Sequence, residues 1–91
     1  MLYTVYILFS PSHDKIYIGY TSNLLVRFKS HNEFGKDWTA KFRPWVVIFC
    51  EYYENKKETM HREKQLKGGQ GRSWIRKKIQ SEFNHVGFIS A

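Results

Sequence analysis

Cysteine is almost absent from this sequence. The single copy, Cys50, stands in the apolar run VVIFC and is interpreted as a small buried hydrophobic residue. A chain with one cysteine has no internal disulfide framework, and no disulfide-linked partner is expected. The four histidines have no paired spacing with Cys50, so a structural zinc site is not expected either.

Long apolar runs are also missing. No stretch is long enough to span a bilayer, and the first residues, MLYTVYILF, show neither a basic leader nor a small-residue cleavage site. No long basic amphipathic helix with a clean apolar face is present. These absences argue against a membrane partner and predict a cytoplasmic protein.

Acidic residues are scarce relative to basic ones. The chain has 8 Asp and Glu against 15 Lys and Arg, which gives a formal net charge of +7. An excess of this size on a small surface attracts polyanions. Nucleic acid is therefore the partner that the charge predicts.

Apolar and aromatic residues are abundant, at 42% and 18% of the chain. These fractions exceed those of a disordered chain and predict a packed core that contains large rings. Ninety-one residues allow one small domain. We place it at residues 1–83 and treat residues 84–91 as a C-terminal tail.

A β-hairpin is predicted at the start of the chain. Residues 2–9 and 15–20 are rich in β-branched and aromatic residues, and the turn formers SPSHD separate them. Alternation along the strands places the aliphatic side chains on one face and brings Tyr6 and Tyr17 together on the other.

A helix is expected after the hairpin, capped by Thr21 or Ser22 and running to about His31. Arg27 lies one turn before His31 along the helix edge. The predicted apolar stripe consists of Leu24, Leu25 and Phe28. The polar residues 32–44 predict a loop that can close over a substrate.

The second half of the chain predicts one strand and two helices. Residues 45–53 are almost continuously apolar and predict a third strand at the centre of the sheet. A helix at about 55–67 is expected to end at Gly68 and Gly69, which tolerate the left-handed conformation.

The last helix is predicted at residues 71–83, because apolar residues recur there every four positions: Ile75, Ile79 and Phe83. The element order ββαβαα predicts a small α+β sandwich.

Glu63 is the least expected residue of the helix at 55–67. At about 100° per residue it bisects Met60 and Leu66, so its carboxylate points where the core stripe is expected. A charge in that place needs a partner, a metal or a raised pKa. An ion pair with one of the five basic residues of this helix is the simplest explanation, and a metal site is the alternative.

Five residues together offer the parts of a reactive site. Arg27 presents a planar set of donors to a phosphate and stays protonated, so it can stabilise charge but cannot act as a base. His31 suits a surface hydrogen bond as well as proton transfer. Tyr6 and Tyr17, taken singly, are ordinary amphipathic strand residues. With Glu63 the set supplies a base, a cation and a metal ligand.

These residues occur in a recognisable order. Thr4-Val5-Tyr6, then Tyr17-Ile18-Gly19, then Arg27, His31 and Glu63 within REKQLKG, resemble the GIY-YIG nuclease superfamily, in particular its small stand-alone members related to the N-terminal domain of the UvrC repair nuclease. The resemblance implies a three-stranded antiparallel sheet flanked by helices. It also implies phosphodiester hydrolysis with a single divalent metal. DNA is ranked above RNA as the expected substrate, and the sequence leaves the choice between them open.

The resemblance assigns roles by position. Tyr6 and Tyr17 are the tyrosines of the two motifs, Arg27 stabilises the phosphate, Glu63 binds the metal and His31 supports the site. A single carboxylate suits Mg²⁺ or Mn²⁺. Tyr6 is ranked before Tyr17 as the base, with the other tyrosine positioning the water or the phosphate, and the sequence does not separate the two roles. A tyrosine base needs a pKa that nearby positive charge lowers from about 10.

Two further groups of residues are expected to contribute. Gly19 is predicted to let the chain turn sharply into the helix. The last helix is predicted to hold the substrate backbone by phosphate contacts, although the same charges also promote solubility. Its basic residues are Arg72, Arg76, Lys77 and Lys78.

The sequence departs from the family pattern at two places. Thr4 replaces the first glycine of the family name, and no asparagine follows Glu63 before Asn84, where many family nucleases have one. The second departure favours an alternative function, a nucleic-acid-binding module that keeps the fold but does not cleave. A protein-interaction domain ranks third.

Overall fold

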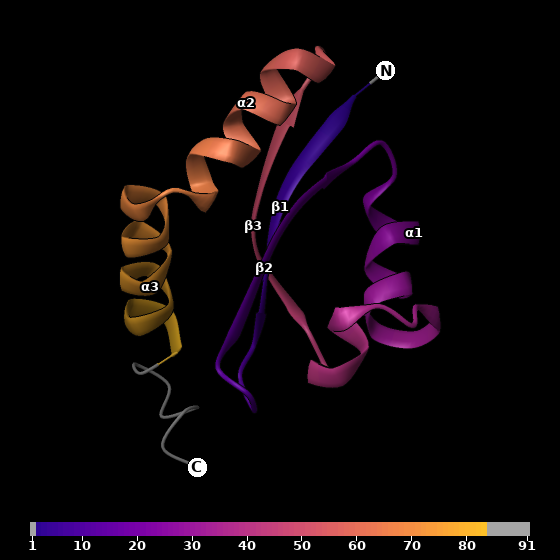
Figure 1. Ribbon diagram of the computed structural model, residues 1–91, viewed down its shortest axis with the longest axis vertical. Helices are drawn as coiled ribbons and strands as arrows, with labels where there is room; N and C mark the ends of the chain where they lie inside the picture. Colours follow the sequence, from indigo (N-terminus) through magenta and orange to yellow (C-terminus); the bar gives the residue numbers. More distant parts are fainter. Residues whose placement is uncertain (1, 84–91) are drawn as a thin grey trace.

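The computed structural model describes residues 2–83, so the predicted tail lies outside the described residues. Its elements are β1 (Tyr3–Ser10), β2 (Lys15–Thr21), α1 (Leu24–Lys29), the π-helical turn η1 (Ser30–Phe34), the 3-10 helix η2 (Trp38–Phe42), β3 (Val46–Tyr53), α2 (Lys56–Lys67) and α3 (Gly69–Phe83). The predicted α+β class and the order ββαβαα are confirmed (Figure 1).

The three strands form one antiparallel sheet in the order β2-β1-β3. The prediction that the third strand is central is wrong, because β1 pairs on both sides and β3 pairs only with β1. The apolar run of β3 was misleading, since Val46 and Val47 are 36% and 38% exposed at the edge. Burial on both faces therefore belongs to β1, whose residues 4–10 are all buried.

The hairpin register sorts the side chains as the alternation predicts. Ile7 pairs with Ile18, whereas Tyr6 pairs with Gly19 and Leu8 with Tyr17. The two tyrosines therefore share one face and the isoleucines share the other, which confirms the prediction.

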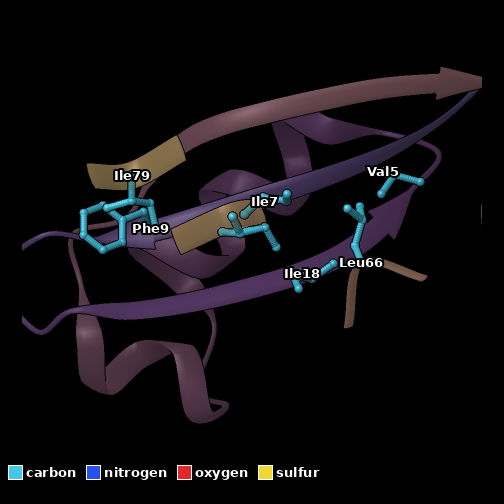
Figure 2. Packing of buried hydrophobic residues seen from close by; sticks show 7 residues of the cluster. Val5, Ile7, Phe9, Ile18, Leu66 and Ile79 are labelled. Atoms are coloured by element: carbon cyan, nitrogen blue, oxygen red, sulfur yellow. The ribbon is translucent and has the colours of Figure 1, made fainter. Parts of the chain in front are cut away.

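Each face of the sheet has its own core. On the aliphatic face α2 and α3 cover the strands, and the buried cluster consists of Val5, Ile7, Phe9, Ile18, Leu66, Ile75 and Ile79 (Figure 2). Burial of each such side chain stabilises the fold by about 1.5–3 kcal/mol. On the tyrosine face Tyr6, Leu8 and Trp45 pack beneath α1 and the short helices, which lie on the other side of the sheet in Figure 1.

α1 begins one or two residues later than expected. Asn23 is the N-cap, and its side chain accepts a hydrogen bond from the backbone N–H of Val26 at 3.2 Å. Thr21, an expected cap, instead ends β2 and accepts from the N–H of Asn23. The predicted apolar stripe is also only partly right, because Leu25 is 66% exposed.

α2 and α3 meet at a tight junction. Asn55 caps α2 by accepting from the N–H groups of Lys57 and Glu58. α2 ends at Lys67 as predicted, but Gly68 has an extended conformation with φ −75°, so the expected left-handed ending is wrong. α3 starts two residues earlier than predicted and buries Ile75 and Ile79, while the side chain of Phe83 lies outside the described part.

The predicted loop at 32–44 is a packed segment built from η1 and η2. Thr39 in its middle is fully buried. Arg43 ties the segment together by donating hydrogen bonds to the backbone carbonyls of Ser30, His31 and Gly35. This region therefore forms a wall of the tyrosine face and is not an open lid. Among residues 2–83 no helix is long and apolar enough to cross a membrane.

Candidate functional site

Gly19 makes room for the two motif tyrosines. A Cβ atom built on Gly19 would lie 2.7 Å from Tyr6 Oη and 3.0 Å from Tyr17 Cε1. Gly19 lies inside β2, opposite Tyr6, so the expectation of a sharp turn into the helix is wrong. The absence of a side chain lets the Tyr6 ring lie across β2, with its centroid 6.2 Å from that of Tyr17.

His31 is buried against both tyrosines. It is 1% exposed, and its Nε2 lies 2.9 Å from Tyr6 Oη. Its ring centroid is 4.6 Å from that of Tyr17. The π-helical turn that carries His31 is a conformation often found at functional sites. The structure therefore excludes the surface hydrogen bond as the explanation for His31 and places it inside the site.

Arg27 lies on α1, and its side chain approaches the hydroxyl groups of Tyr6 and Tyr17. Hydrogen bonding of its side chain, first with Tyr6 and then with Tyr17, raises the pKa of Arg27 above its ordinary value. The residue is otherwise exposed, so the guanidinium forms the solvent side of the site. A phosphate that reaches Arg27 would also meet both tyrosine hydroxyls.

Tyr6 is held as a neutral phenol. Burial raises its pKa to about 12, the hydrogen bond with Arg27 opposes this effect, and the charges of Tyr17 and Glu63 add to it. The expected fall of the pKa toward neutrality is therefore not found, because burial of the hydroxyl outweighs the positive charge of Arg27. Any proton that Tyr6 accepts must be matched by one that it releases.

His31 is also neutral at pH 7. Burial is the main cause that lowers its pKa, the positive charges of Arg27 and Arg43 lower it further, and Asp37 acts in the opposite direction. A neutral imidazole has one N–H and one free lone pair, so His31 can accept a proton.

Glu63 lies at the edge of the core. Its side chain is 20% exposed, and it follows the fully buried Thr59 by four residues and precedes Leu66 by three. Met60, expected to flank it in the core, is 48% exposed. The simple ion pair exists, but Lys67 Nζ lies 3.6 Å from Glu63 Oε2, beyond a direct hydrogen bond.

The donor set fits only a weakly held metal. Residues 2–83 contain no group of three or more His, Cys, Asp or Glu residues able to enclose a metal ion. One carboxylate, that of Glu63, lies close enough to Tyr6 to influence its pKa. Mg²⁺ or Mn²⁺ accepts such a site, because these ions keep several waters and take further oxygens from a substrate phosphate.

The chain matches one known protein family over nearly its whole length. The family model described as the GIY-YIG catalytic domain matches residues 2–79. This chain belongs to the GIY-YIG family. Within the matched range, Tyr6 lies on β1, and Tyr17 and Gly19 lie on β2.

Three relatives of this GIY-YIG protein share more than a third of the aligned residues. UPF0213 protein CPE1444 of Clostridium perfringens is 38% identical over 69% of this chain and 68% of its own length. UPF0213 protein RBAM_000440 of Bacillus velezensis is 36% identical over 76% and 74%. UPF0213 protein SH2523 of Staphylococcus haemolyticus is 36% identical over 59% and 67%. No solved structure matches the chain.

The basic residues of α3 lie away from the GIY-YIG tyrosines. α3 packs on the aliphatic face, whereas Tyr6 belongs to the core of the other face. In Figure 1, α3 and α1 lie on opposite sides of the sheet. Arg76 pairs with Asp14 at 2.6 Å, and Lys78 pairs with Glu82 at the same distance. The structure therefore does not bring Arg72, Arg76, Lys77 and Lys78 to the phosphate position expected at Arg27.

Sequence reasoning missed the residues behind His31. Thr39 Oγ1 lies 2.9 Å from His31 Nδ1, and the Thr39 hydroxyl also contacts the carboxylate of Asp37. Trp45 packs there at 2% exposure and donates from Nε1 to the carbonyl of Thr39. The only local signal is Asp37 two residues before Thr39, a spacing typical of a helix N-cap.

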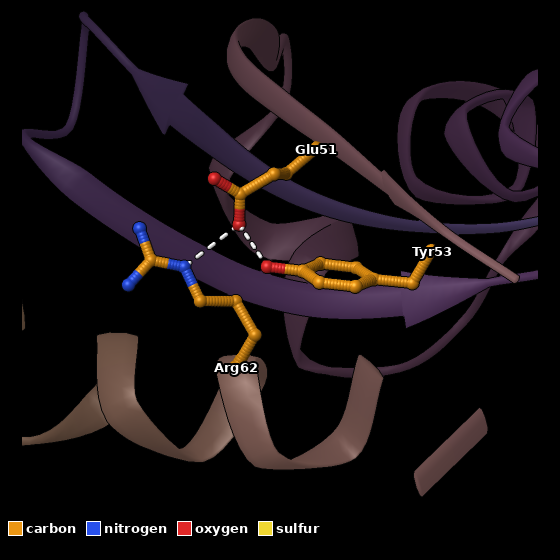
Figure 3. Close-up of polar contacts among 3 residues, drawn as sticks. All are labelled: Glu51, Tyr53 and Arg62. Carbon is orange, nitrogen blue, oxygen red and sulfur yellow. Dashed lines mark hydrogen bonds and ion pairs between the residues drawn. The ribbon is translucent and has the colours of Figure 1, made fainter. Parts of the chain in front are cut away.

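A polar network fixes α2, which carries Glu63, on the sheet. Glu51 Oε1 of β3 accepts hydrogen bonds from Tyr53 Oη at 2.6 Å and from Arg62 Nε at 2.7 Å (Figure 3). Burial raises the pKa of Glu51, but these two hydrogen bonds and the positive charge of Arg62 together outweigh burial, so the net pKa is lowered. Because Glu63 follows Arg62, the network helps to set its position.

Replacing Glu51 by glutamine is expected to lower the free energy of unfolding by about 0.5–1 kcal/mol, the range of partly exposed ion pairs. The folded pKa of Glu51 is lowered, so its contribution is present above the unfolded pKa of about 4.3 and is lost as the pH falls. Urea unfolding of parent and variant at pH 7 and pH 3 measures this. A stability difference that is the same at both pH values would contradict it.

Proposed function

We propose that this protein is a metal-dependent endonuclease that hydrolyses phosphodiester bonds in nucleic acid, with DNA as its substrate. The observation that carries the proposal is the convergence of four side chains from the four elements β1, β2, α1 and η1: Tyr6, Tyr17, Arg27 and His31. Family membership and the net charge of +7 support the same substrate class.

Arg27 binds the scissile phosphate in this proposal. Its guanidinium offers paired N–H donors to the non-bridging oxygens, where charge accumulates as water attacks. Tyr17 lies beside it and orients the phosphate or the attacking water through its hydroxyl group. Because α1 and β2 hold both groups, the substrate meets a site that is already arranged.

The proton chemistry falls to Tyr6 and His31. Tyr6 stays a phenol, so it serves as a proton acceptor only if its own proton leaves at the same time. His31 Nε2 at 2.9 Å is the group placed to take it. Mg²⁺ or Mn²⁺ bound by Glu63 would supply positive charge to the phosphoryl oxygens.

A non-cleaving nucleic-acid-binding module is the second candidate. The observation in its favour is the absence of asparagine between Glu63 and Asn84. The two functions separate in one experiment, incubation with branched, single-stranded and duplex DNA, and with RNA of the same sequences, with and without Mg²⁺ or Mn²⁺. Metal-dependent cuts support the nuclease, while salt-sensitive binding without cuts supports the module.

Substitution of Arg27 by lysine is expected to reduce cleavage by about 10²–10³-fold, the usual cost of losing a donor to transition-state charge. One ammonium group cannot reproduce the planar guanidinium. The fold is expected to be retained, because Arg27 is exposed and lysine is a good helix former. Single-turnover cleavage and circular dichroism measure the two effects.

Lys29→Ala is the matched control for this variant. Lys29 lies on the same helix and is exposed, so the control removes one positive charge at a distance of two residues. It is expected to cut at the parent rate. Equal rates for Arg27→Lys and the parent would remove the phosphate-binding role of Arg27.

A further inference from the structure

A continuous line of hydrogen bonds runs from Tyr6 through His31 to Asp37. His31 Nε2 lies 2.9 Å from Tyr6 Oη, and Nδ1 lies 2.9 Å from Thr39 Oγ1. The Thr39 hydroxyl is in turn bonded to Asp37 Oδ1. His31 and Thr39 are 1% and 0% exposed, so water does not compete for the inner contacts.

The donor and the acceptor of each hydrogen bond in this line follow from the ionisation state of Asp37. A hydrogen bond from the Thr39 hydroxyl is the main cause that lowers the pKa of Asp37, so Asp37 is an ionised carboxylate that can only accept. The single hydroxyl proton of Thr39 is thus donated to Asp37. Thr39 Oγ1 must then accept from His31, which puts the proton of the neutral imidazole on Nδ1.

We infer that Asp37 and Thr39 are positioning residues, which hold His31 as the Nδ1–H tautomer and leave the Nε2 lone pair to accept the Tyr6 proton. The catalytic consequence rests on the proposed nuclease function, while the tautomer does not. A histidine whose second nitrogen is fixed by a neighbour has a defined acceptor side.

The proton transfers balance around Tyr6. The water oxygen bonds to phosphorus as the bond from phosphorus to the leaving oxygen breaks. One water proton passes to Tyr6 Oη while the Tyr6 proton passes to His31 Nε2. The leaving oxygen takes a proton from solvent, and His31 returns its proton to solvent after product release. Tyrosinate is never formed as a free species, which agrees with a Tyr6 pKa of about 12.

Asp37 is the acidic group that favours the imidazolium formed in this step. Burial and the charges of Arg27 and Arg43 all disfavour that cation, whereas Asp37 stabilises it. The titratable groups that face His31 are Tyr6 of β1, Tyr17 of β2, Arg27 of α1, and Asp37 and Arg43 of the segment around η2. Loss of the Asp37 charge therefore lowers the pKa of His31.

Thr39 is held firmly enough for this role. Asp37 caps η2 by accepting from the backbone N–H of Thr39 at 3.0 Å. The Thr39 carbonyl accepts from Trp45 Nε1 at 2.8 Å. The backbone N–H and the carbonyl of Thr39 are thus both hydrogen-bonded, which fixes the position of the hydroxyl that faces His31.

The first test is the tautomer itself, read from the ring ¹⁵N chemical shifts of the histidines, with the exposed His61 as the internal reference. The parent and Thr39→Ser are expected to show the Nδ1–H form of His31 at pH 7, and Thr39→Val is expected to lose that preference. Asp37→Asn keeps an accepting oxygen and is expected to keep the tautomer. An Nε2–H form or a charged ring in the parent would overturn the inference.

The second test is the pH dependence of cleavage. Asp37→Asn is expected to lower the maximal rate by at least about 10-fold and to move the acid limb to lower pH, because His31 must be neutral to accept a proton. Thr39→Val is expected to cleave about 10²-fold more slowly than the parent. Thr39→Ser keeps a hydroxyl group and is expected to retain most of the parent rate. A lower rate with an unmoved acid limb in Asp37→Asn would show a merely structural role and overturn the catalytic part.

Two controls separate stability and function from the inference. Thr59→Val removes a hydroxyl from another fully buried threonine, on α2, and is expected to lower stability without moving the acid limb. Asp37 is exposed, so its asparagine variant is expected to fold even if Thr39→Val does not. A parent that cuts no substrate would defeat the proposed function, and the tautomer would still decide the positioning role.

Discussion

Substitution of Gly19 by alanine is expected to reduce cleavage by at least about 10²-fold and to lower the free energy of unfolding by about 1–3 kcal/mol. The added Cβ would lie 2.7 Å from Tyr6 Oη and 2.9 Å from Cζ of the same ring, closer than real contacts allow. Tyr6 is 1% exposed and cannot rotate into solvent without leaving the core. The ring must therefore shift and take its hydroxyl away from His31.

Thermal or urea unfolding and single-turnover cleavage measure the two losses. Gly69→Ala is the control, because no atom lies within 4 Å of a Cβ built there. The cause is identified by a double-mutant cycle: Tyr6→Phe removes the oxygen that clashes, so part of the stability cost of Gly19→Ala should disappear in the Tyr6→Phe background. If the stability costs of Gly19→Ala and Tyr6→Phe simply add, or if Gly19→Ala cleaves at the parent rate, then the role of Gly19 is not to leave room for the Tyr6 ring.

Substitution of Glu63 by glutamine is expected to abolish the metal dependence and lower cleavage by about 10²-fold or more. Glutamine keeps the shape of the side chain but removes the charge that would hold a divalent ion in the proposed function. The melting temperature with chelator present is expected to stay unchanged or rise slightly. The ion pair lost is long, at 3.6 Å, and its lysine is 48% exposed, so it contributes at most about 0.5 kcal/mol.

Lys67→Ala is the matched control, since it breaks the same ion pair and leaves the carboxylate in place. This variant is expected to retain both cleavage and Mn²⁺ binding. The binding is measured by the paramagnetic broadening of nearby NMR resonances. A Glu63→Gln variant that is clearly destabilised, still binds Mn²⁺ and still cuts would assign Glu63 to structure alone.

Local periodicity was sufficient to predict that Tyr6 and Tyr17 share one face of the hairpin and that Arg27 lies one turn before His31. Alternating side chains along a strand and residues four apart on a helix share a face for steric reasons that need no distant partner. The same local rules failed at the helix start, because Thr21, Ser22 and Asn23 are all good caps and only the end of β2 decides among them.

Long-range pairing decided the features that the sequence misassigned. The apolar run of β3 predicted a central strand, but the partner of each strand depends on contacts between distant residues. Gly19 was expected to serve a turn, and its steric role became visible only when Tyr6 was placed opposite it. That the basic residues of α3 hold the substrate backbone stays a prediction, and the pairing of the strands places this helix on the face of the sheet opposite Tyr6.

The sequence by itself determined the α+β class and the family, and it predicted one site made of Tyr6, Tyr17, Arg27, His31 and Glu63. Those conclusions rest on local spacing and on motif order, which are written in the chain. Only the tertiary structure decided that burial keeps Tyr6 protonated and that Thr39 stands behind His31. Desolvation and hydrogen-bond direction depend on which groups meet across the fold, and no local pattern in residues 32–44 encodes that meeting.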